Sequence, residues 1–580
     1  MVPNITSVSE SFFKSKSAAV RWRSSKKQNM FRRIVAILTP DEKRIFAVLS
    51  TLDIVISLID ILSLAFLLWL IQFYIQPGVK PLFFVPHWLL NKNSVAPIAA
   101  FFLLFSAKNL LAFYIATKQN KFIAKVAVRI SENNLIHYQN SDFQEFINVD
   151  SSVQIRKIAH QPFDFCMHLL AGVQQIITQT SLIVITIIAI IFFNVKLFLL
   201  LLLILLPPVI AVFYFVKKHL TIAKIHLKTS NQISLQYLMD ALKGYVEGNI
   251  FGRNDFFLRR FVAHRTKFSQ HLFDSISLQT LPSRLIEIFA VMGLFILIAI
   301  AKWTGNSDTG AFITIGAFMA AAYKIIPGIV KIVNTLGQMK AYEFSVNDIA
   351  DSKEYDTHKT AKPNTRIQSL QFSNIGFHYN GKPVLTDLSF SLQKGDFIGI
   401  TGNSGKGKTT IFNLLLGFLS PHSGEILIND LPVHKAEIKN FWTSIAYVRQ
   451  QCFFIHDTVQ RNITLEETGY NEMKLQFAIQ GSGLDEFVND SIEGPDKIIT
   501  ENGKNISGGQ QQRIALARAV YKDADLILLD EPFNELDEAS ELSLLVHFKQ
   551  LADSGKMVIM ITHNKKALSY CSQIISLDQK

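Results

Sequence analysis

Six runs of apolar residues lie in the first 345 residues of the chain. They fall near 45–75, 95–117, 163–193, 197–217, 280–302 and 310–332. Each run is long enough to cross a bilayer of about 30 Å as a helix. The sequence after the second and fourth runs is polar, compatible with helix and free of proline and glycine clusters. The pattern therefore predicts six spanning helices, some of which continue into the cytoplasm as helical extensions.

The pattern changes near residue 350. A polar stretch is followed by short strands with Gly, Pro and Asn turns, and then by alternating strands and helices after Phe397. Such alternation is typical of an α/β domain. We therefore expect a multidomain chain with a basic N-terminal segment (1–40), an all-α six-helix transmembrane domain (41–345), a linker (346–365) and an α/β domain (366–580).

The distribution of charge gives the orientation. The 580 residues carry a formal net charge of +12, but ten Lys and Arg residues lie within the first 44 positions, just before the first apolar run. The connections after the second and fourth runs are also basic, whereas the others contain few Lys or Arg. The positive-inside rule then places both termini in the cytoplasm. Topology explains the basic charge, so nucleic acid is not an expected partner.

Three short stretches predict local features around the spans. The sequence favours an amphipathic helix over about 29–40 that lies on the cytoplasmic membrane face. Thr39 and Pro40 then indicate the start of the first spanning helix. The polar patches 138–144 and 244–252 combine turn formers with aromatic residues. Each patch is either an exposed hinge or a small transverse helix that docks another domain.

The stretch 402–410 carries the first clear chemistry. It follows the apolar run 397–400, precedes a helical run and matches the pattern G-x-x-x-x-G-K-[ST]. In such a P-loop, backbone N–H groups and a helix N-terminus bind phosphate, the lysine reaches the β- and γ-phosphates, and the next hydroxyl can ligate Mg²⁺. The α/β domain is therefore a predicted P-loop NTPase that binds nucleotide through Gly402, Asn403, Ser404, Gly405, Lys406, Gly407, Lys408, Thr409 and Thr410.

Two further stretches point to hydrolysis. A buried-strand run ends in Asp530, which is placed to hold Mg²⁺, and Glu531, which is placed to polarise the attacking water. Ser507, Gly508 and Gly509 begin a helix and form a second N-terminus suited to phosphate. One γ-phosphate does not need two such ends. We therefore expect the second end to serve a nucleotide held by another copy of the chain.

Together these features resemble the ATP-binding cassette (ABC) in motif order and spacing. The six-span region before them resembles the membrane domain of exporter-type half-transporters, so the resemblance covers nearly the whole chain. The positions that carry it are the loop at Gly402, Gln450, the stretch from Ser507 to Gln510, Asp530 with Glu531, Asp537, and His563.

The resemblance implies roles for the residues around the γ-phosphate. The catalytic residues would be Glu531, His563 and Gln450, of which Gln450 senses Mg²⁺ or the attacking water. The cofactors would be ATP and Mg²⁺, with the metal held through Thr409, Gln450 and Asp530. Since Lys408, Glu531, Ser507 and His563 are all present, both sites of a homodimer are expected to hydrolyse ATP.

The resemblance also implies a shared site and a base-stacking residue. Asp537 would couple the two sites, and Tyr379 would stack on adenine, with Phe377 as the alternative ring. The signature that closes on the partner's γ-phosphate would consist of Ser507, Gly508, Gly509 and Gln510. Two departures stand out: Ile506 replaces the usual Leu, and 532–535 reads Pro-Phe-Asn-Glu where exporters commonly have Ala-Thr-Ser-Ala. The second departure could alter communication between the sites.

Polar residues inside the apolar runs bear on the substrate, because they are costly in a membrane unless they face a cavity or a partner. Asp53, Asp60 and Lys324 lie in such runs, and Arg284 and Glu287 are spaced to pair with each other. The candidate cavity residues are Gln174, Gln175, Thr178, Gln179 and Lys108. These side chains favour an amphipathic, polar-headed substrate over a purely apolar one.

The chain is therefore predicted to be an ATP-driven exporter or flippase that works by alternating access as a homodimer or with a related half-transporter. A multi-pass location in the inner (plasma) membrane follows, with the ATP site in the cytoplasm. Within exporters the N-terminal spans resemble bacterial lipid-linked oligosaccharide flippases, so the expected substrate is an amphipathic small molecule, lipid or peptide. The alternatives are a small-peptide or siderophore exporter and a non-transport ABC regulator.

Overall fold

The computed structural model describes residues 30–75, 95–141, 143, 149–193, 229–303, 309–350, 366–379 and 381–578, with isolated positions between 195 and 214. The chain divides into two compact units. Residues 1–141 and 149–355 form the helical unit, and residues 142–148 and 356–580 form the α/β unit. The expected fold class, a helical domain followed by an α/β P-loop domain, is confirmed.

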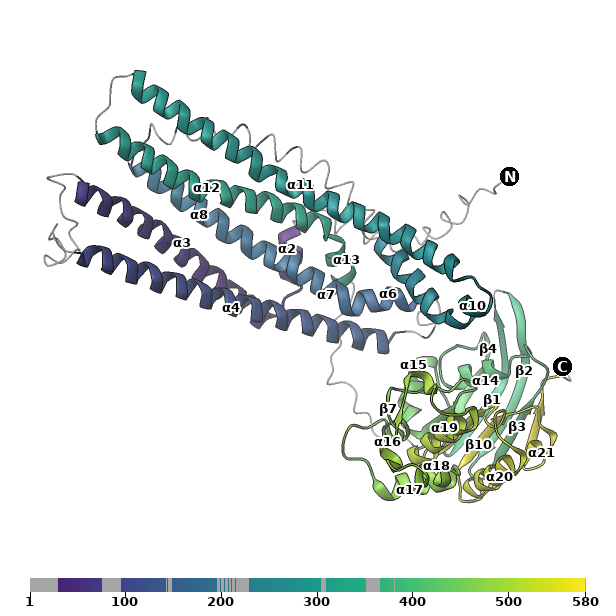
Figure 1. The fold of residues 1–580 in the computed structure, drawn as a ribbon. Coiled ribbons are helices and arrows are strands. Elements are labelled where there is room, and N and C mark those ends of the chain that lie inside the picture. The colour runs from purple at the N-terminus through teal and green to yellow at the C-terminus, as the bar shows by residue number, and fades with distance from the viewer. Residues whose placement is uncertain are drawn as a thin grey trace, which may run out of the picture. The chain divides into compact units, whose positions relative to one another are not determined.

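Long helices build the helical unit, and Figure 1 shows α3, α4, α8, α11 and α12 running in the same general direction. Within the helical unit, α8 packs against both α3 and α12. Two π-helical turns, 156–160 and 165–170, interrupt the chain between α6 and α8. Residues 229–243 are helical. The other described helices of this unit are α2 (Met30–Ala36), α3 (Pro40–Ile75), α4 (Ala96–Gln139), α6 (Ser151–Ile155), α7 (Gln161–Asp164), α8 (Ala171–Phe193), α10 (Tyr245–Ile250), α11 (Asn254–Trp303), α12 (Thr309–Ala341) and α13 (Phe344–Ala350).

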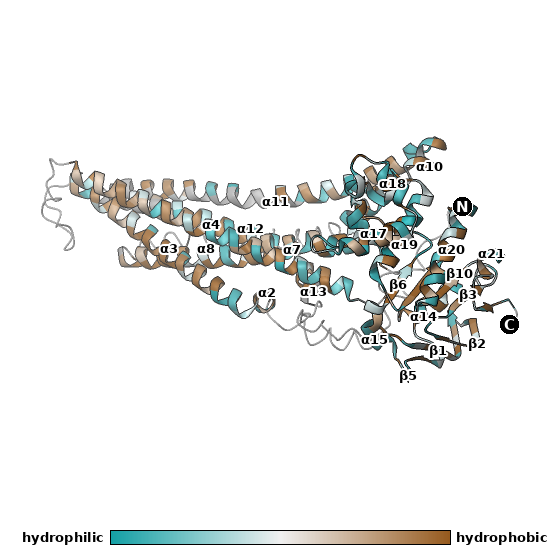
Figure 2. Cartoon of the chain, turned by 90° about the horizontal axis from the view of Figure 1, so that it is seen from below, coloured by the Kyte–Doolittle hydropathy of each residue, from teal (hydrophilic) through white to brown (hydrophobic). Residues whose placement is uncertain are grey.

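Several of these helices are apolar enough to cross a membrane. Within the described residues, the segments Pro40–Tyr74, Ala96–Gln139 and Ser151–Phe192 have the necessary length and hydropathy. Figure 2 shows the hydrophobic colour along α3, α4 and α8. The fifth and sixth predicted spans lie within α11 and α12. The fourth, 197–217, lies largely outside the described residues.

The start of α3 agrees with the expectation from Thr39 and Pro40. The backbone N–H of Thr39 donates to Oε2 of Glu42 at 2.9 Å, and the N–H of Glu42 donates to the Thr39 hydroxyl at 3.3 Å. This reciprocal capping box satisfies two N–H groups that the first turn of a helix leaves free. The first long helix therefore begins at Pro40 for a local reason that the sequence contains.

The preceding helix, α2, differs from its expectation in its surroundings. The helix forms within the predicted range, but Ile34 is fully buried and Leu38 is nearly so. Both belong to a core cluster with Phe46, Phe122 and Phe165. The apolar side of this segment therefore packs against protein, and the expected interfacial helix is corrected in this respect.

Three other local predictions have clear outcomes. Residues 245–250 form the short helix α10, and Arg284 pairs with Glu287 at 3.6 Å as expected. Helix α13 continues to Ala350, so the helical structure extends into the stretch expected as linker. In the other polar patch, 138–144, α4 ends at Gln139, and residues 142 and 144 lie outside the described residues. Phe143 is described, and its ring stacks on Phe418 within the α/β unit with ring centroids 4.2 Å apart.

Three sheets form the α/β unit. An antiparallel sheet has the order β2-β1-β4-β5, a parallel sheet has the order β11-β3-β10-β9-β6, and β7 pairs with β8. The strands are β1 (Ser369–Tyr379), β2 (Lys382–Gln393), β3 (Phe397–Thr401), β4 (Ser423–Ile428), β5 (Leu431–Pro432), β6 (Ile445–Val448), β7 (Asp457–Thr458), β8 (Ile498–Ile499), β9 (Leu526–Asp530), β10 (Met557–Ile561) and β11 (Gln573–Ser576).

Helices cover both faces of the parallel sheet. Phe397 and Ile398 are adjacent on β3 and belong to different core clusters, because neighbouring side chains point to opposite faces of a strand. Residues of α14 (Lys408–Leu415) pack in the cluster of Ile398, and residues of α19 (Gly508–Lys522) pack in that of Phe397. The other helices are α15 (Lys435–Ile438), α16 (Val459–Thr464), α17 (Glu472–Gly481), α18 (Asp485–Asn489), α20 (Glu538–Asp553) and α21 (Lys565–Leu568), with 3₁₀ turns at 439–444, 494–496 and 501–503.

The register of the parallel sheet explains why distant motifs meet. Ile561 on β10 lies opposite Ile400 on β3 and opposite Asp530 on β9. Val448 at the end of β6 lies opposite Leu529. The carboxyl ends of these four strands therefore lie at one edge of the sheet, which is where open α/β sheets bind their ligands.

Candidate functional site

The P-loop follows β3 at this edge. Its glycines Gly402, Gly405 and Gly407 all have positive φ angles. A side chain at Gly407 would come within 2.7 Å of Val384, so only glycine fits where the loop turns into α14. The Lys408 ammonium lies inside the loop and donates to the carbonyls of Gly402, at 2.7 Å, and Asn403, at 3.2 Å. The loop thus places a buried cation beside the N-terminus of a helix.

Asp530 ends β9 next to this cation. Its side chain is buried, and it accepts hydrogen bonds from Thr409 and from the Tyr447 hydroxyl, the latter at 3.4 Å. Burial and the nearby charge of Glu531 raise the pKa of Asp530 to about 6, against the effects of Tyr447, Lys408 and Thr409. Burial of the Tyr447 hydroxyl and the nearby charge of Asp530 raise the pKa of that hydroxyl, which therefore stays a donor.

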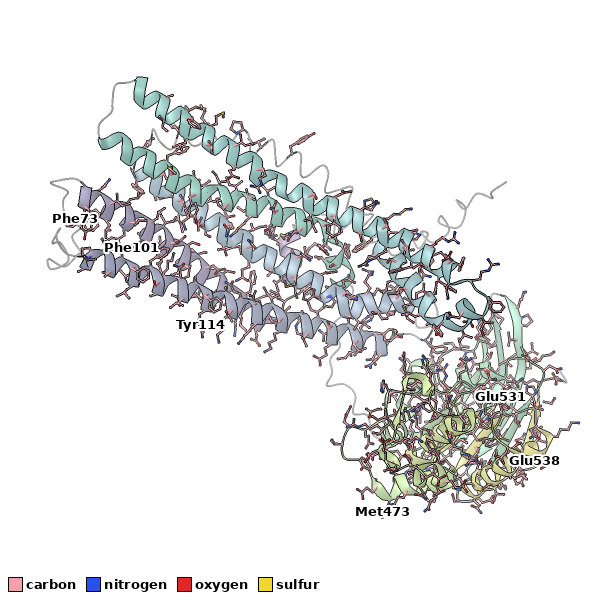
Figure 3. The ribbon with its side chains drawn as sticks, in the orientation of Figure 1. Phe73, Phe101, Tyr114, Met473, Glu531 and Glu538 are labelled. Carbon is pink, nitrogen blue, oxygen red and sulfur yellow. The ribbon has the colours of Figure 1, made fainter. Side chains whose placement is uncertain are left out.

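Glu531 begins the turn after β9 and has an unusual backbone. Its φ is +48°, and its N–H donates to the carbonyl of Ile561 at 3.0 Å, which ties the turn to β10. Oε2 accepts from Nε2 of Gln450 at 2.7 Å and from Nδ2 of Asn534 at 2.8 Å. A left-handed residue of this kind is strained and is found most often at functional sites. Figure 3 labels Glu531 in the α/β unit.

His563 follows β10, and its ring lies close to both Lys408 and Glu531. Its Nε2 lies 2.9 Å from Nζ of Lys408 and 3.6 Å from Oε1 of Glu531. An ammonium has no acceptor, so Nε2 must accept in the shorter contact. The sheet edge thus brings Lys408, Asp530, Glu531, His563 and Gln450 together.

The signature forms the N-terminus of α19. Ser507 caps this helix, because its hydroxyl accepts from the N–H of Gln510 at 3.3 Å while Oε1 of Gln510 accepts from the N–H of Ser507 at 3.0 Å. Ser507 is exposed, and Gln510 is partly buried. Asp537 caps α20 in a similar way and accepts from the backbone N–H of Ser540 at 3.1 Å. These caps leave an accessible helix N-terminus at Gly508 and Gly509, suited to an anionic group from outside the chain.

The two aromatic candidates for adenine stacking lie in different environments. Phe377 is buried in the core, whereas Tyr379 at the end of β1 is 46% exposed. The two rings meet edge to face with centroids 4.8 Å apart. Only the exposed ring offers a face to a ligand, so the geometry favours Tyr379.

The donor set fits ATP with Mg²⁺. Thr409, Gln450 and Asp530 would supply oxygen ligands of the kind that Mg²⁺ prefers, together with phosphate oxygens of a bound nucleotide. Within the described residues, no group of three or more His, Cys, Asp and Glu side chains could hold a metal by itself. The nucleotide would therefore be part of the metal site, and the metal would neutralise charge that develops on the phosphates.

The raised pKa of Asp530 makes stability depend on pH. In the folded state Asp530 keeps its proton up to about pH 6, whereas in the unfolded state it loses the proton near its ordinary pKa of 3.8. Its contribution to the free energy of unfolding should therefore fall as the pH rises from about 4 to 6 and stay level above pH 6. We expect Asp530→Asn to stabilise the nucleotide-free protein by up to about 3 kcal/mol above pH 6 and by little at pH 4. Thermal unfolding in EDTA between pH 4 and 8 measures this. The exposed Asp490→Asn is the control, and an equal gain at all pH values for Asp530→Asn would contradict the assignment.

The helical unit contains two polar clusters. The first surrounds Asp53 on α3. Its carboxylate accepts from Gln119 at 2.6 Å, from Thr178 at 2.8 Å and from Gln174 at 3.4 Å. Gln175 is exposed on another face of α8. Of the predicted cavity residues in this helix, Gln174 and Thr178 therefore converge on one carboxylate, and Gln175 does not.

The second cluster surrounds Asp60, two helical turns further along α3. Nζ of Lys108 on α4 lies 2.5 Å from Oδ1, and Nζ of Lys324 on α12 binds Oδ2. The Lys108 side chain is only 7% exposed and also lies over the Phe105 ring. Meanwhile Leu103, Leu110 and Phe113 on α4 are each about 70% exposed. The spans thus bury charge among themselves and expose apolar side chains.

The structure adds partners that the sequence did not reveal. Gln119, Asn534 and Tyr447 each donate to a predicted carboxylate, and Oδ1 of Asp578 accepts from the N–H of Asn403 at 2.9 Å. Gln119 and Asp578 come from segments distant in sequence from their partners. No local signal marks them, although Asn534 lies within the departure at 532–535.

Comparisons with known proteins agree with this geometry. Residues 385–534 match the family model of the ABC transporter. An ATP-dependent lipid A-core flippase of Alkalilimnicola ehrlichii is 29% identical over 353 residues, which cover 59% of this chain and 59% of that protein. An ATP-dependent lipid A-core flippase of Vibrio vulnificus is 27% identical over 373 residues, 63% of each chain. The matches thus span less than two thirds of these relatives' lengths.

A solved structure resembles nearly the whole chain. The structure of a bacterial Atm1-family ABC exporter with ATP bound superposes with a TM-score of 0.72, at 20% identity, and covers 92% of this chain and 94% of that one. At this identity the likeness shows the fold. Residues 385–534 therefore match the ABC transporter model, and the chain shares the fold of that solved exporter structure. The resemblance seen in the sequence is confirmed.

Proposed function

We propose that this chain is half of an ATP-driven exporter or flippase in the inner (plasma) membrane. It moves an amphipathic, polar-headed substrate out of the cytoplasm or the inner leaflet by alternating access. The observation that carries the proposal is the placement of Asp53, Asp60 and Lys108 inside spans with apolar outer faces, where Lys108 is buried and the two carboxylates are partly buried. Buried ionisable groups in a membrane are costly and are characteristic of substrate or ion pathways.

The nucleotide site supplies the energy in this proposal. ATP with Mg²⁺ binds the P-loop, Thr409, Gln450 and Asp530, and Tyr379 stacks on adenine. Glu531 is the general base and His563 contacts the γ-phosphate. The signature from Ser507 to Gln510 of a second copy, or of a related half-transporter, completes the site, and Asp537 couples the two sites. The exposed caps of Ser507 and Asp537 support this arrangement.

Reconstitution in proteoliposomes tests the proposal. The reconstituted wild type is tested against a panel of labelled amphipathic lipids and peptides. A panel member that is transported is expected to raise the rate of ATP hydrolysis. Stimulation by a peptide or siderophore alone would favour the alternative exporter. ATP binding and hydrolysis without movement of any substrate would instead support a non-transport regulator.

Cross-linking tests the shared site. With Cys452 and Cys571 replaced, Ser507→Cys combined with Ser404→Cys is expected to form a covalent dimer when ATP is bound, because the signature then faces the partner's P-loop. The matched control combines Ser404→Cys with Asn489→Cys, which places the second cysteine at an exposed position outside the signature. A dimer that forms equally without ATP, or equally with the control, would count against the shared site.

A further inference from the structure

Glu531 has a second amide partner that the motif roles do not explain. Nδ2 of Asn534 and Nε2 of Gln450 both donate to Oε2, at 2.8 and 2.7 Å. A carboxylate oxygen accepts about two hydrogen bonds, so Oε2 is saturated. The free acceptor capacity of Glu531 is on Oε1, which lies on the side of His563.

The turn that carries Asn534 is firmly held. Pro532 and Phe533 are buried, and the N–H of Leu536 donates to the carbonyl of Phe533 at 3.1 Å. The N–H of Glu535 donates at 3.0 Å to the side-chain oxygen of Gln512, which is buried in α19. Asn534 therefore projects from a fixed backbone only three residues after Glu531.

The two donors to Oε2 differ in their freedom. Gln450 lies on an exposed loop after β6 and, in the proposed function, also serves the metal or the attacking water. Asn534 has a short side chain on an anchored turn, so its bond to Glu531 survives a movement of Gln450. Of the two amides, Asn534 is the one that can orient the carboxylate throughout the cycle.

We propose that Asn534 is a positioning residue that holds Glu531 so that Oε1 faces the attacking water. The inference rests on the proposed role of Glu531 as general base. It also gives the departure at 532–535 a function. A side-chain carbon added at Gly508 would lie 3.0 Å from Oε2 of Glu535, so the turn that carries Asn534 touches the signature. Closure of the signature on a partner's nucleotide then bears on the turn that orients the base.

Kinetics of the reconstituted full-length protein test this role. Asn534→Ala is expected to lower kcat roughly 10- to 100-fold, since support for a reacting group is lost, while the KM for ATP stays within about twofold. Asn534→Asp places a second carboxylate against Glu531, and like charges raise a carboxyl pKa. The acidic limb of its kcat–pH profile should therefore move to higher pH. Asn489→Ala, an exposed asparagine on α18, is the control and should match the wild type.

A double variant separates positioning from stability. In the Glu531→Gln background, Asn534→Ala should reduce the residual hydrolysis no further, because it acts only through the carboxylate. An equal fold-loss in both backgrounds would overturn the proposal. So would wild-type kinetics of Asn534→Ala, or lower kcat in Asn534→Asp with an unmoved pH profile. If Glu531→Gln itself hydrolysed ATP at the wild-type rate, the proposed catalytic role of Glu531 would fail instead.

Discussion

Replacing Glu531 by Gln is expected to lower ATP hydrolysis about 10²–10⁴-fold while ATP binding is retained. The amide has nearly the same shape and can still accept hydrogen bonds from Gln450 and Asn534. It cannot accept a proton from the attacking water. The P-loop contacts of Lys408 do not involve Glu531, so the binding of nucleotide should be preserved. Phosphate release and binding of a fluorescent ATP analogue measure the two steps separately.

The control for this variant is another glutamate of the same unit. Glu538→Gln changes an exposed carboxylate at the start of α20 that pairs with Lys566, and it should hydrolyse ATP at the wild-type rate (Figure 3). A parallel loss in both variants would show that the protein is generally disturbed. Loss of ATP binding in Glu531→Gln would mean that Glu531 has a structural rather than a catalytic role.

The residues of the candidate site could be singled out from the sequence, because they occur in short motifs at strand ends. Gly402 to Thr410, Asp530 with Glu531, and His563 each follow an apolar run that reads as a buried strand. Their convergence depends on the strand order β3-β10-β9-β6, which single motifs do not encode. The contact of Lys408 with His563 exists because β3 and β10 are neighbours in that order.

In the helical unit, contacts within one helix could be predicted from the sequence, but contacts between helices could not. The pair Arg284 and Glu287 was predictable, since residues three apart on a helix lie on the same side. The cluster of Asp60, Lys108 and Lys324 was not, because it joins three helices whose relative rotation and height a single sequence does not reveal. The individual charges could be identified as unusual, but not their partners.

Burial of the N-terminal helix was not predicted for a related reason. The apolar side of α2 is visible in the sequence, but an apolar face pairs equally well with lipid and with other helices. Ile34 is fully buried in the cluster that includes Phe122 and Phe165, so protein is its actual partner. Amphipathicity thus indicates that a face will be covered, and tertiary packing decides by what.

The second large effect is expected at Asp60. Removing its carboxylate by Asp60→Leu leaves the buried ammonium of Lys108 and the partly buried ammonium of Lys324 without their counterion. Breaking a buried ion pair at one partner costs about 3–5 kcal/mol, and an apolar membrane offers no alternative solvation. Thermal unfolding in detergent and the yield of folded protein measure the loss. The control is Glu287→Gln, whose exposed pair with Arg284 is worth at most about 1 kcal/mol.

The triple variant Asp60→Leu, Lys108→Met, Lys324→Met separates the cost of the cluster from its use. Replacing a whole buried ionic group by apolar residues is often neutral or stabilising, so the triple variant should recover the stability that Asp60→Leu loses. A cluster that only fastens α3, α4 and α12 would then leave substrate-stimulated ATP hydrolysis unchanged. We expect the triple variant to be stable but to lose stimulation by a polar-headed substrate, because charges buried at such a cost in a membrane serve the transported molecule. Unchanged stimulation would assign the cluster to helix packing.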